Sequence, residues 1–191
     1  MRWASFGFVF LFAAAAAAEP AVTFPGPVTE LRAPNSELRV SYVDAGANAD
    51  QSHDYSLHLE YPDGRSEEIV VFTRSVDVAW SPSSDALSVT NQIGSNVADC
   101  YVITPGPQTK RISLTDVVIQ GRFPAPAWAL QHSAHGSVAC DGWTGQDTVH
   151  FVLEGSGGDS PNGFHYAFVY DVKRGVAKLD RSPSPRKKKR Y

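Results

Sequence analysis

The chain has 191 residues, a length that suits one globular domain with its own hydrophobic core. Its composition, 42% hydrophobic, 11% aromatic and 19% charged, is globular and excludes a chain that is disordered throughout. The net charge of −3 conceals an asymmetry. Residues 19–180 hold all 20 acidic residues and ten basic ones, a net charge of −10, whereas residues 181–191 hold six basic residues and no acid.

Residues 1–18 have the parts of a secretory signal peptide. Arg2 supplies a positive start, residues 6–15 are almost wholly apolar, and three alanines before Glu19 offer a cleavage site. The alternative is a membrane anchor, but this apolar run is shorter than the roughly 20 residues that cross a bilayer. We therefore expect cleavage and export, either to the periplasm or out of the cell.

The first predicted unit covers residues 33–73 and follows a Pro-rich, extended lead-in at 20–34. Apolar and polar residues alternate in this unit with the period of two that is typical of half-buried strands. Pro62-Asp63-Gly64-Arg65 predicts a hairpin turn, because glycine tolerates the positive φ that such turns need. The strands are expected at 37–44, 55–61 and 68–73.

The second predicted unit covers residues 75–114, and its strands are expected at 76–80, 86–90, 99–104 and 110–114. Pro105-Gly106-Pro107 separates the last two of them. The pattern is irregular from 115 to 135. Residues 114–120 fit one short helix, and Pro124 and Pro126 are expected to end any regular element there.

The third predicted unit covers residues 136–180, and its strands are expected at 137–143, 148–154, 164–172 and 176–179. Aromatic side chains fall on one face of the third of these strands, which argues for a core position. The pattern stops after Asp180. Residues 181–191, two Ser-Pro pairs followed by a basic run, are predicted to form a disordered basic tail.

One short pattern recurs in the three units: a polar turn cluster that leads into an alternating strand. It covers residues 76–89 in the second unit, 141–152 in the third and, in a more degenerate form, 33–40 in the first. Repeats at this spacing predict stacked β units. The predicted fold is therefore all-β and antiparallel, with three blade-like sheets in one domain at 19–180 and a disordered basic tail.

Ala79-Trp80-Ser81-Pro82, followed at once by an alternating strand, resembles the blade repeat of TolB-type and WD-like β-propellers, in which a strand ends in Trp-Ser-Pro-Asp-Gly. Ser83 and Ser84 stand where that family has Asp-Gly, and Trp143-Thr144-Gly145 lacks the proline. The resemblance covers residues 34–180 and implies a fragment similar to a propeller. Separately, the segment 94–101 resembles small exported bacterial proteins of unknown function, which implies no activity.

Three blades fall short of the four to eight that usually close a propeller, and they leave free edges where chains can associate. Three outcomes are open: a compact barrel or sandwich, an edge covered by residues 115–135, or association of two chains. We expect a monomer with a covering loop.

The chain has two cysteines, Cys100 and Cys140. Export leads to an oxidising compartment, where such a pair often forms a disulfide, and closing this loop would stabilise the fold by about 4 kcal/mol. The alternative is two buried, small apolar residues. The sequence leaves both open, because it does not show whether the side chains meet.

Three polar loops, 44–50, 91–99 and 154–163, follow the repeated strands and share Gly, Asn and Asp. If the units are true repeats, these loops lie at one end of the sheets, a common place for binding residues. The alternative, that these residues only serve turn geometry, is the commoner case. Clustered oxygens also suit Ca²⁺, although no loop has the EF-hand spacing. The candidate ligand-binding residues are Asp44, Asp50, Asn96, Asp99, Asp159 and Asn162.

No catalytic or metal-binding motif accompanies these loops. His132 and His135 have a spacing that permits metal binding, but a histidine pair on a surface loop is the better interpretation. The sequence has no Gly-x-Ser-x-Gly, no His-Glu-x-x-His and no phosphate-binding glycine loop. Trp80 and Trp143 are expected to be core anchors, and Trp128 is the better candidate for an exposed aromatic residue.

The basic run 186–190 suits an anionic surface, such as lipid headgroups or envelope polyanions. Two alternatives are that this run binds the acidic body of the same chain, or that it stays in solvent without a partner. The export signal argues against a nucleic-acid partner. We expect an exported binding or scaffold module of the cell envelope, with an envelope protein or ligand as its partner. The alternatives are a small envelope hydrolase or carbohydrate-acting protein that uses the loop face, and a fragment that works only in an oligomer.

Overall fold

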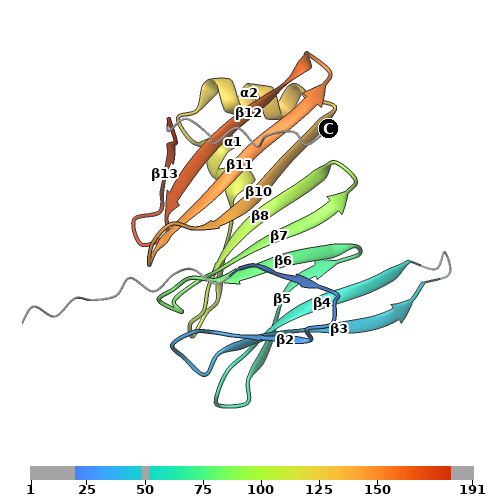
Figure 1. Cartoon of the computed structure of the whole chain (residues 1–191), viewed down its shortest axis with the longest axis vertical. Helices are drawn as coiled ribbons and strands as arrows, with labels where there is room; N and C mark the ends of the chain where they lie inside the picture. Colours follow the sequence, from blue (N-terminus) through green and yellow to red (C-terminus); the bar gives the residue numbers. More distant parts are fainter. Residues whose placement is uncertain (1–19, 49–51, 182–191) are drawn as a thin grey trace, which may run out of the picture.

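The computed structural model of the protein describes residues 20–48 and 52–181. Three antiparallel sheets and two short helices make up this part of the chain, which confirms the predicted all-β antiparallel class. The sheets follow one another in chain order along the long axis of the molecule (Figure 1). The predicted signal peptide, Asp50 and the tail from residue 182 onwards lie outside the described residues.

Strands adjacent in the sequence are adjacent in space in each sheet, except that β1 joins sheet 2 beside β6. Sheet 1 contains β2 (Glu30–Arg32), β3 (Arg39–Ala47), β4 (His53–Glu60) and β5 (Ser66–Phe72). Sheet 2 contains β1 (Val22–Phe24), β6 (Ser75–Trp80), β7 (Leu87–Gly94), β8 (Val97–Thr104) and β9 (Lys110–Ser113). Sheet 3 contains β10 (His135–Trp143), β11 (Thr148–Gly157), β12 (Ser160–Asp171) and β13 (Val176–Leu179).

Two helices connect sheets 2 and 3. Helix α1 (Leu114–Gln120) lies where the sequence predicts it, and the Ser113 hydroxyl caps it by accepting the Asp116 N–H at 3.2 Å. The expectation that Pro124 and Pro126 end regular structure is wrong. Helix α2 (Pro124–His132) begins at Pro124, because the first helical turn needs no backbone donor there. Neither helix in the described part of the chain has the length and apolar character of a membrane span.

Sheet 2 lies between the other two sheets and is packed on both faces (Figure 1). Successive residues of a strand point to opposite faces, so β6 serves both cores. Val78 and Trp80 belong to the core shared with sheet 1, whereas Ala79 belongs to the core shared with sheet 3 and α1. Sheets 1 and 3 are therefore the two ends of a three-sheet stack.

Equivalent contacts join each sheet to the one before it. Trp80, the last residue of β6, donates its indole N–H to the carbonyl oxygen of Leu31 in sheet 1 at 3.3 Å. Trp143, the last residue of β10, donates to the carbonyl oxygen of Ala79 in sheet 2 at 3.1 Å. Both acceptors stand one residue before the end of their strand. Arg32 ends β2, before which the described residues form no other stacked sheet, and its side chain is 78% exposed.

The turns that follow β2, β6 and β10 also contact one another. The Asn35 side-chain amide donates to the Pro82 carbonyl oxygen at 2.6 Å, and the Ser83 hydroxyl donates to the Gln146 carbonyl oxygen at 3.0 Å. Ser84 accepts the Asn35 backbone N–H at 2.7 Å and has a φ of 66°, the left-handed conformation that favours glycine. Ser84 thus keeps a strained backbone and supplies a contact between sheets.

We expect Ser84→Ala to lower the free energy of unfolding by about 0.5–1.5 kcal/mol, because the part-buried hydrogen bond from the Asn35 N–H to the Ser84 hydroxyl is lost. Ser84→Gly loses the same hydrogen bond but relieves the positive φ, so it should be more stable than Ser84→Ala by about 1 kcal/mol. Urea unfolding of the two variants measures this difference. Equal midpoints for the two would contradict the assigned backbone strain.

Candidate functional site

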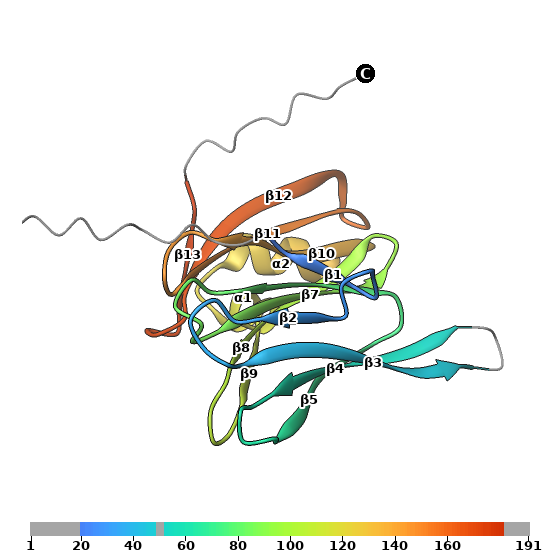
Figure 2. The same ribbon diagram turned by 60° about the horizontal axis from the view of Figure 1, so that its bottom comes forward.

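The loops predicted to share one end of the sheets do so. The ends of β3, β7 and β11 that lead into the hairpins all lie on the right and upper right of the molecule in Figure 1. They do not converge, because β3 and β4 extend beyond the rest of the protein (Figure 2). A common end is therefore not a common binding site.

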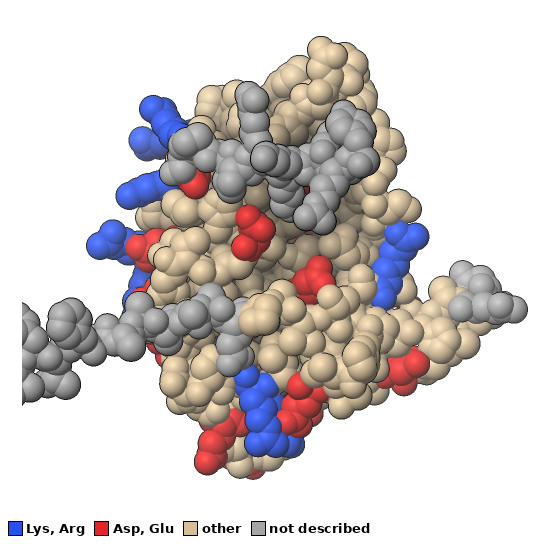
Figure 3. Space-filling view, in the orientation of Figure 1, with Lys and Arg blue, Asp and Glu red and all other residues tan. Residues whose placement is uncertain are grey.

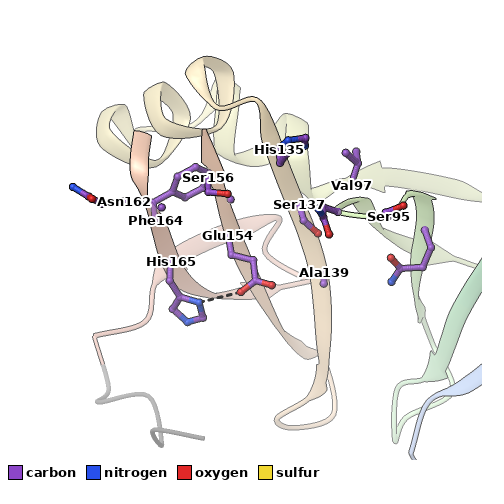
Figure 4. Close-up of a pocket in the computed structure, with 14 residues that line it drawn as sticks. Ser95, Val97, His135, Ser137, Ala139, Glu154, Ser156, Asn162, Phe164 and His165 are labelled. Atoms are coloured by element: carbon purple, nitrogen blue, oxygen red, sulfur yellow. Dashed lines mark ion pairs between the residues drawn. The ribbon is translucent and has the colours of Figure 1, made fainter. Parts of the chain in front are cut away.

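One open hollow of about 700 Å³ does lie at this end, between the β7–β8 hairpin and the β10–β12 part of sheet 3. We call it the hairpin groove (Figure 4). Its lining has no Lys and no Arg. Neutral hydrogen-bonding side chains predominate, and they are Gln92, Ser95, Asn96, Ser137, Ser156 and Asn162. The ionisable lining residues are His135, Glu154 and His165.

A covalent bond fixes the two walls of the groove to each other. Cys100 on β8 and Cys140 on β10 form a disulfide, with their Cα atoms 5.6 Å apart, which confirms one of the two alternatives left open by the sequence. The Cys140 N–H also donates to the Thr90 hydroxyl at 3.0 Å, which ties β10 to β7. The disulfide and this hydrogen bond therefore fix the distance between the hairpin wall and the sheet 3 wall of the groove.

Glycine at position 155 shapes the sheet 3 wall. A Cβ atom there would collide with the His135 carbonyl oxygen and lie 2.7 Å from the ring of Phe164, which is opposite Gly155 in the ladder. The neighbouring pair, Glu154 and His165, lies on the other face of the sheet, with a carboxylate oxygen 3.5 Å from the imidazole Nδ1 (Figure 4). Glu154 and His165 give the wall an ionisable pair, whereas the partly buried Phe164 ring packs over Gly155 and against the core on the other face of the sheet.

Of the six sequence-predicted site residues, Asn96 and Asn162 line the hairpin groove. Asp99 instead accepts the Thr115 hydroxyl at 2.6 Å, beside the start of α1. The backbone N–H of Asp159 donates to the His132 carbonyl oxygen at the end of α2. Asp44 lies in sheet 1 and is paired with His53 at 3.0 Å. Asp50 lies outside the described residues.

Sequence reasoning missed the groove residues that lie on strands rather than in loops. Ser137, Glu154 and His165 share one face of sheet 3, in register across β10, β11 and β12. The alternation of 164–172 placed His165 on the face opposite the aromatic residues. The position of His165 on that face is the signal that the sequence offers. The partner strand and its register are also needed to show that Glu154 lies beside His165.

The resolved pKa shifts lie away from the groove. The backbone N–H of Gly46, together with His53, lowers the pKa of the Asp44 carboxyl. Burial, together with Asp99, raises the pKa of Tyr101 to about 12. Each shift is explained by packing or hydrogen bonding within its own sheet region, so neither one points to a catalytic group.

His132 and His135 do not face a common point. His132 stacks on Trp128, with ring centroids 4.7 Å apart, whereas His135 lines the groove. Within residues 20–48 and 52–181, no three His, Cys, Asp or Glu side chains are grouped as metal ligands would be. Trp128 is 46% exposed, while Trp80 and Trp143 are buried, as the sequence predicts.

Comparison of the chain with family models, curated proteins and solved structures finds no match. The resemblance to TolB-type and WD-like blades therefore stays a prediction from the sequence.

Proposed function

We propose that the protein is an exported, non-catalytic binding module of the cell envelope that holds its ligand in the hairpin groove. The observation that carries this proposal is the covalent link between the groove walls, because the Cys100–Cys140 disulfide joins β8 to β10. A site held in its binding geometry before the ligand arrives loses less conformational freedom on binding. Export is supported by the signal-like residues 1–18, and the disulfide is compatible with an oxidising compartment.

The lining favours an uncharged, hydroxyl-rich ligand such as an oligosaccharide. Amide side chains at Asn96 and Asn162 each offer donors and an acceptor, and the serine hydroxyls offer both roles. Glu154 is paired with His165, and no basic side chain in the lining would select an anion.

The same lining favours binding over hydrolysis of such a ligand. Glycoside hydrolases generally place two carboxyl groups on either side of the bond that breaks. Glu154 is the one carboxyl side chain among the groove residues.

We propose a separate role for the basic tail, which is attraction of the module to anionic lipid headgroups or polyanions of the envelope.

We expect a neutral oligosaccharide at 100 times its Kd to stabilise the protein by about 2.7 kcal/mol, seen as a rise in Tm across a panel of envelope glycans. Asn96→Ala and Asn162→Ala should each weaken the binding of the best glycan about fivefold to tenfold, the loss of one hydrogen bond. Asn48→Ala, in the β3–β4 hairpin and outside the groove, is the matched control and should bind normally. A flat panel, or unchanged binding by both groove variants, would overturn the proposal.

A further inference from the structure

The ionisable side chains of the hairpin groove are two histidines and one glutamate. His135, His165 and Glu154 line the groove, and its lining contains no Lys, Arg or Asp. Histidine is the side chain whose charge ordinarily changes between about pH 5 and 8. The formal charge of the lining is therefore −1 while both histidines are neutral, and it becomes +1 when both are protonated, because two positive charges join one negative charge.

The two histidines differ in their partners. His165 lies beside Glu154, with its Nδ1 atom 3.5 Å from a carboxylate oxygen, so a protonated His165 cancels the charge of Glu154. The exposed His135 side chain has no hydrogen-bond, ion-pair or ring partner within residues 20–48 and 52–181. Protonation of both histidines therefore leaves one uncompensated positive charge in the groove, and that charge is on His135.

Hydroxyl groups lie next to His135 on the same face of sheet 3. Ser156 is its register partner on β11, and Ser137 is two residues further along β10. Figure 4 shows His135 and Ser137 on the sheet 3 wall, across from Ser95 of the β7–β8 hairpin. Serine hydroxyls can donate to an anion, and a protonated histidine donates from both ring nitrogens. A negatively charged group at His135 would thus meet a cation and neutral donors together.

Other charged groups near the groove do not belong to its lining. Figure 3 shows no Lys or Arg at the upper right of this face, where the β11–β12 hairpin lies. Arg74 contacts the hairpin wall from outside the groove, where its guanidinium donates to the Ser95 hydroxyl at 3.4 Å. The remaining charged or titratable groups at the end of α2, at the tip of the β11–β12 hairpin and on the outer face of sheet 3 are His132, Asp141, His150, Asp159, Lys178 and Asp180.

We propose that the hairpin groove binds a second class of ligand, anionic oligosaccharides, when mild acid protonates His135. This second activity rests on the proposed glycan-binding function of the groove. The anionic group of the sugar, a carboxylate or a phosphate, lies at His135, while its hydroxyls use the same amide side chains as a neutral glycan. Hydrogen bonds to a charged donor are about twice as strong as neutral ones, so the protonated histidine favours the anion.

The direction of the pH dependence follows from the charge. An anion binds the protonated groove more tightly than the neutral groove, so its affinity rises as the pH falls. A neutral glycan gains no ion pair, and its affinity stays nearly constant. Lysine and arginine remain charged between about pH 5 and 8, so attraction of an anion by Arg74 or by the basic tail does not change over this range.

Calorimetric titration of the chain from Glu19 to Tyr191, with its disulfide intact, tests this with two matched ligands. Tetragalacturonate carries carboxylates that stay ionised, and its methyl ester keeps the same rings without the charge. We expect tetragalacturonate to bind about tenfold more tightly at about pH 5.5 than at about pH 7.5, and the ester to bind equally at both. A phosphate-bearing oligomannose, titrated in the same way, shows which of the two anionic groups gains more.

Substitutions locate the effect. His135→Gln keeps a hydrogen-bonding side chain that does not become charged, so it should lose the gain in acid. Glu154→Gln removes the negative charge of the lining and should bind tetragalacturonate more tightly at both pH values. His132→Gln makes the same change as His135→Gln outside the lining and is the control.

The outcomes separate this second activity from the proposed function. If neither anionic ligand bound more tightly in acid, or if a folded His135→Gln variant kept the full gain, the second activity would be overturned. Binding of the methyl ester or another neutral glycan would still support the proposed function. If no neutral glycan bound but the gain in acid were present and depended on His135, the proposed function would fail and the anion site would stand.

Discussion

Reduction of the Cys100–Cys140 disulfide is expected to lower the free energy of unfolding by about 4 kcal/mol, among the largest effects available to a single change in this protein. The two cysteines are 40 residues apart in the sequence, so the bond removes a large closed loop from the conformations open to the unfolded chain. Urea unfolding with and without reductant measures the effect as a shift of the midpoint. The Cys100→Ala/Cys140→Ala variant should unfold close to the reduced protein and should not respond to reductant.

The same experiment separates two roles of the disulfide. A folded domain typically has about 5–15 kcal/mol of stability, so the reduced protein is expected to stay folded in water. Its groove walls on β8 and β10 are then held by packing and by hydrogen bonds from β10 to sheet 2, such as those of Cys140 to Thr90 and Trp143 to Ala79. Ligand affinity should therefore fall in the reduced but folded protein. If reduction moved neither the urea midpoint nor the affinity, the disulfide would have neither role.

Much of the fold could be predicted because local patterns determine it. The alternation of apolar and polar residues marks the strands, and α1 begins and ends where the sequence indicates. The exceptions depend on contacts distant in the sequence. The lead-in at 20–34 supplies β1 to sheet 2, where Val22 pairs with Val78, and no local pattern specifies that partner. Helix α2 was missed because Pro124 was interpreted as a helix breaker rather than a first-turn residue.

Less of the candidate site could be predicted, for a geometrical reason. The sequence indicates that the three polar loops lie at one end, but not how far the sheets fan apart. Asn96 and Asn162 line one groove because their hairpins belong to adjacent sheets, whereas Asp44 is on the sheet at the other end of the stack. Asp99 shows a second limit, because its carboxylate is already bonded to Thr115 beside α1.

Because the sheets diverge from one another, the turn ends and the hairpin ends of the strands have different surroundings. At the turn ends, the clusters after β2, β6 and β10 contact one another directly, through Asn35 to Pro82 and Ser83 to Gln146. At the hairpin ends, the strands separate, and a groove opens between the β7–β8 hairpin and sheet 3. Direct contacts between the sheets are therefore concentrated at one end of the sheets, and the groove lies at the other.

Trp80→Ala and Trp143→Ala are each expected to lower the free energy of unfolding by about 3–5 kcal/mol, because each leaves a cavity at a junction between sheets. Trp80 is 1% exposed and Trp143 is 6% exposed. The phenylalanine variants keep most of the apolar contact but lose the indole N–H, so they should lose only about 1–3 kcal/mol. Trp128→Ala, at a residue that is 46% exposed, is the control and should change stability by about 0.5 kcal/mol or less.

Hydrogen exchange distinguishes the two junctions. Trp80 holds sheet 1 on sheet 2, so its replacement should speed exchange in β2–β5 more than in β10–β13. Trp143 holds sheet 3 on sheet 2, and its replacement should have the opposite distribution. Uniform acceleration across all three sheets in both variants would mean that the stack unfolds as one cooperative unit. The equivalent tryptophan contacts would then stabilise the whole protein rather than each junction separately.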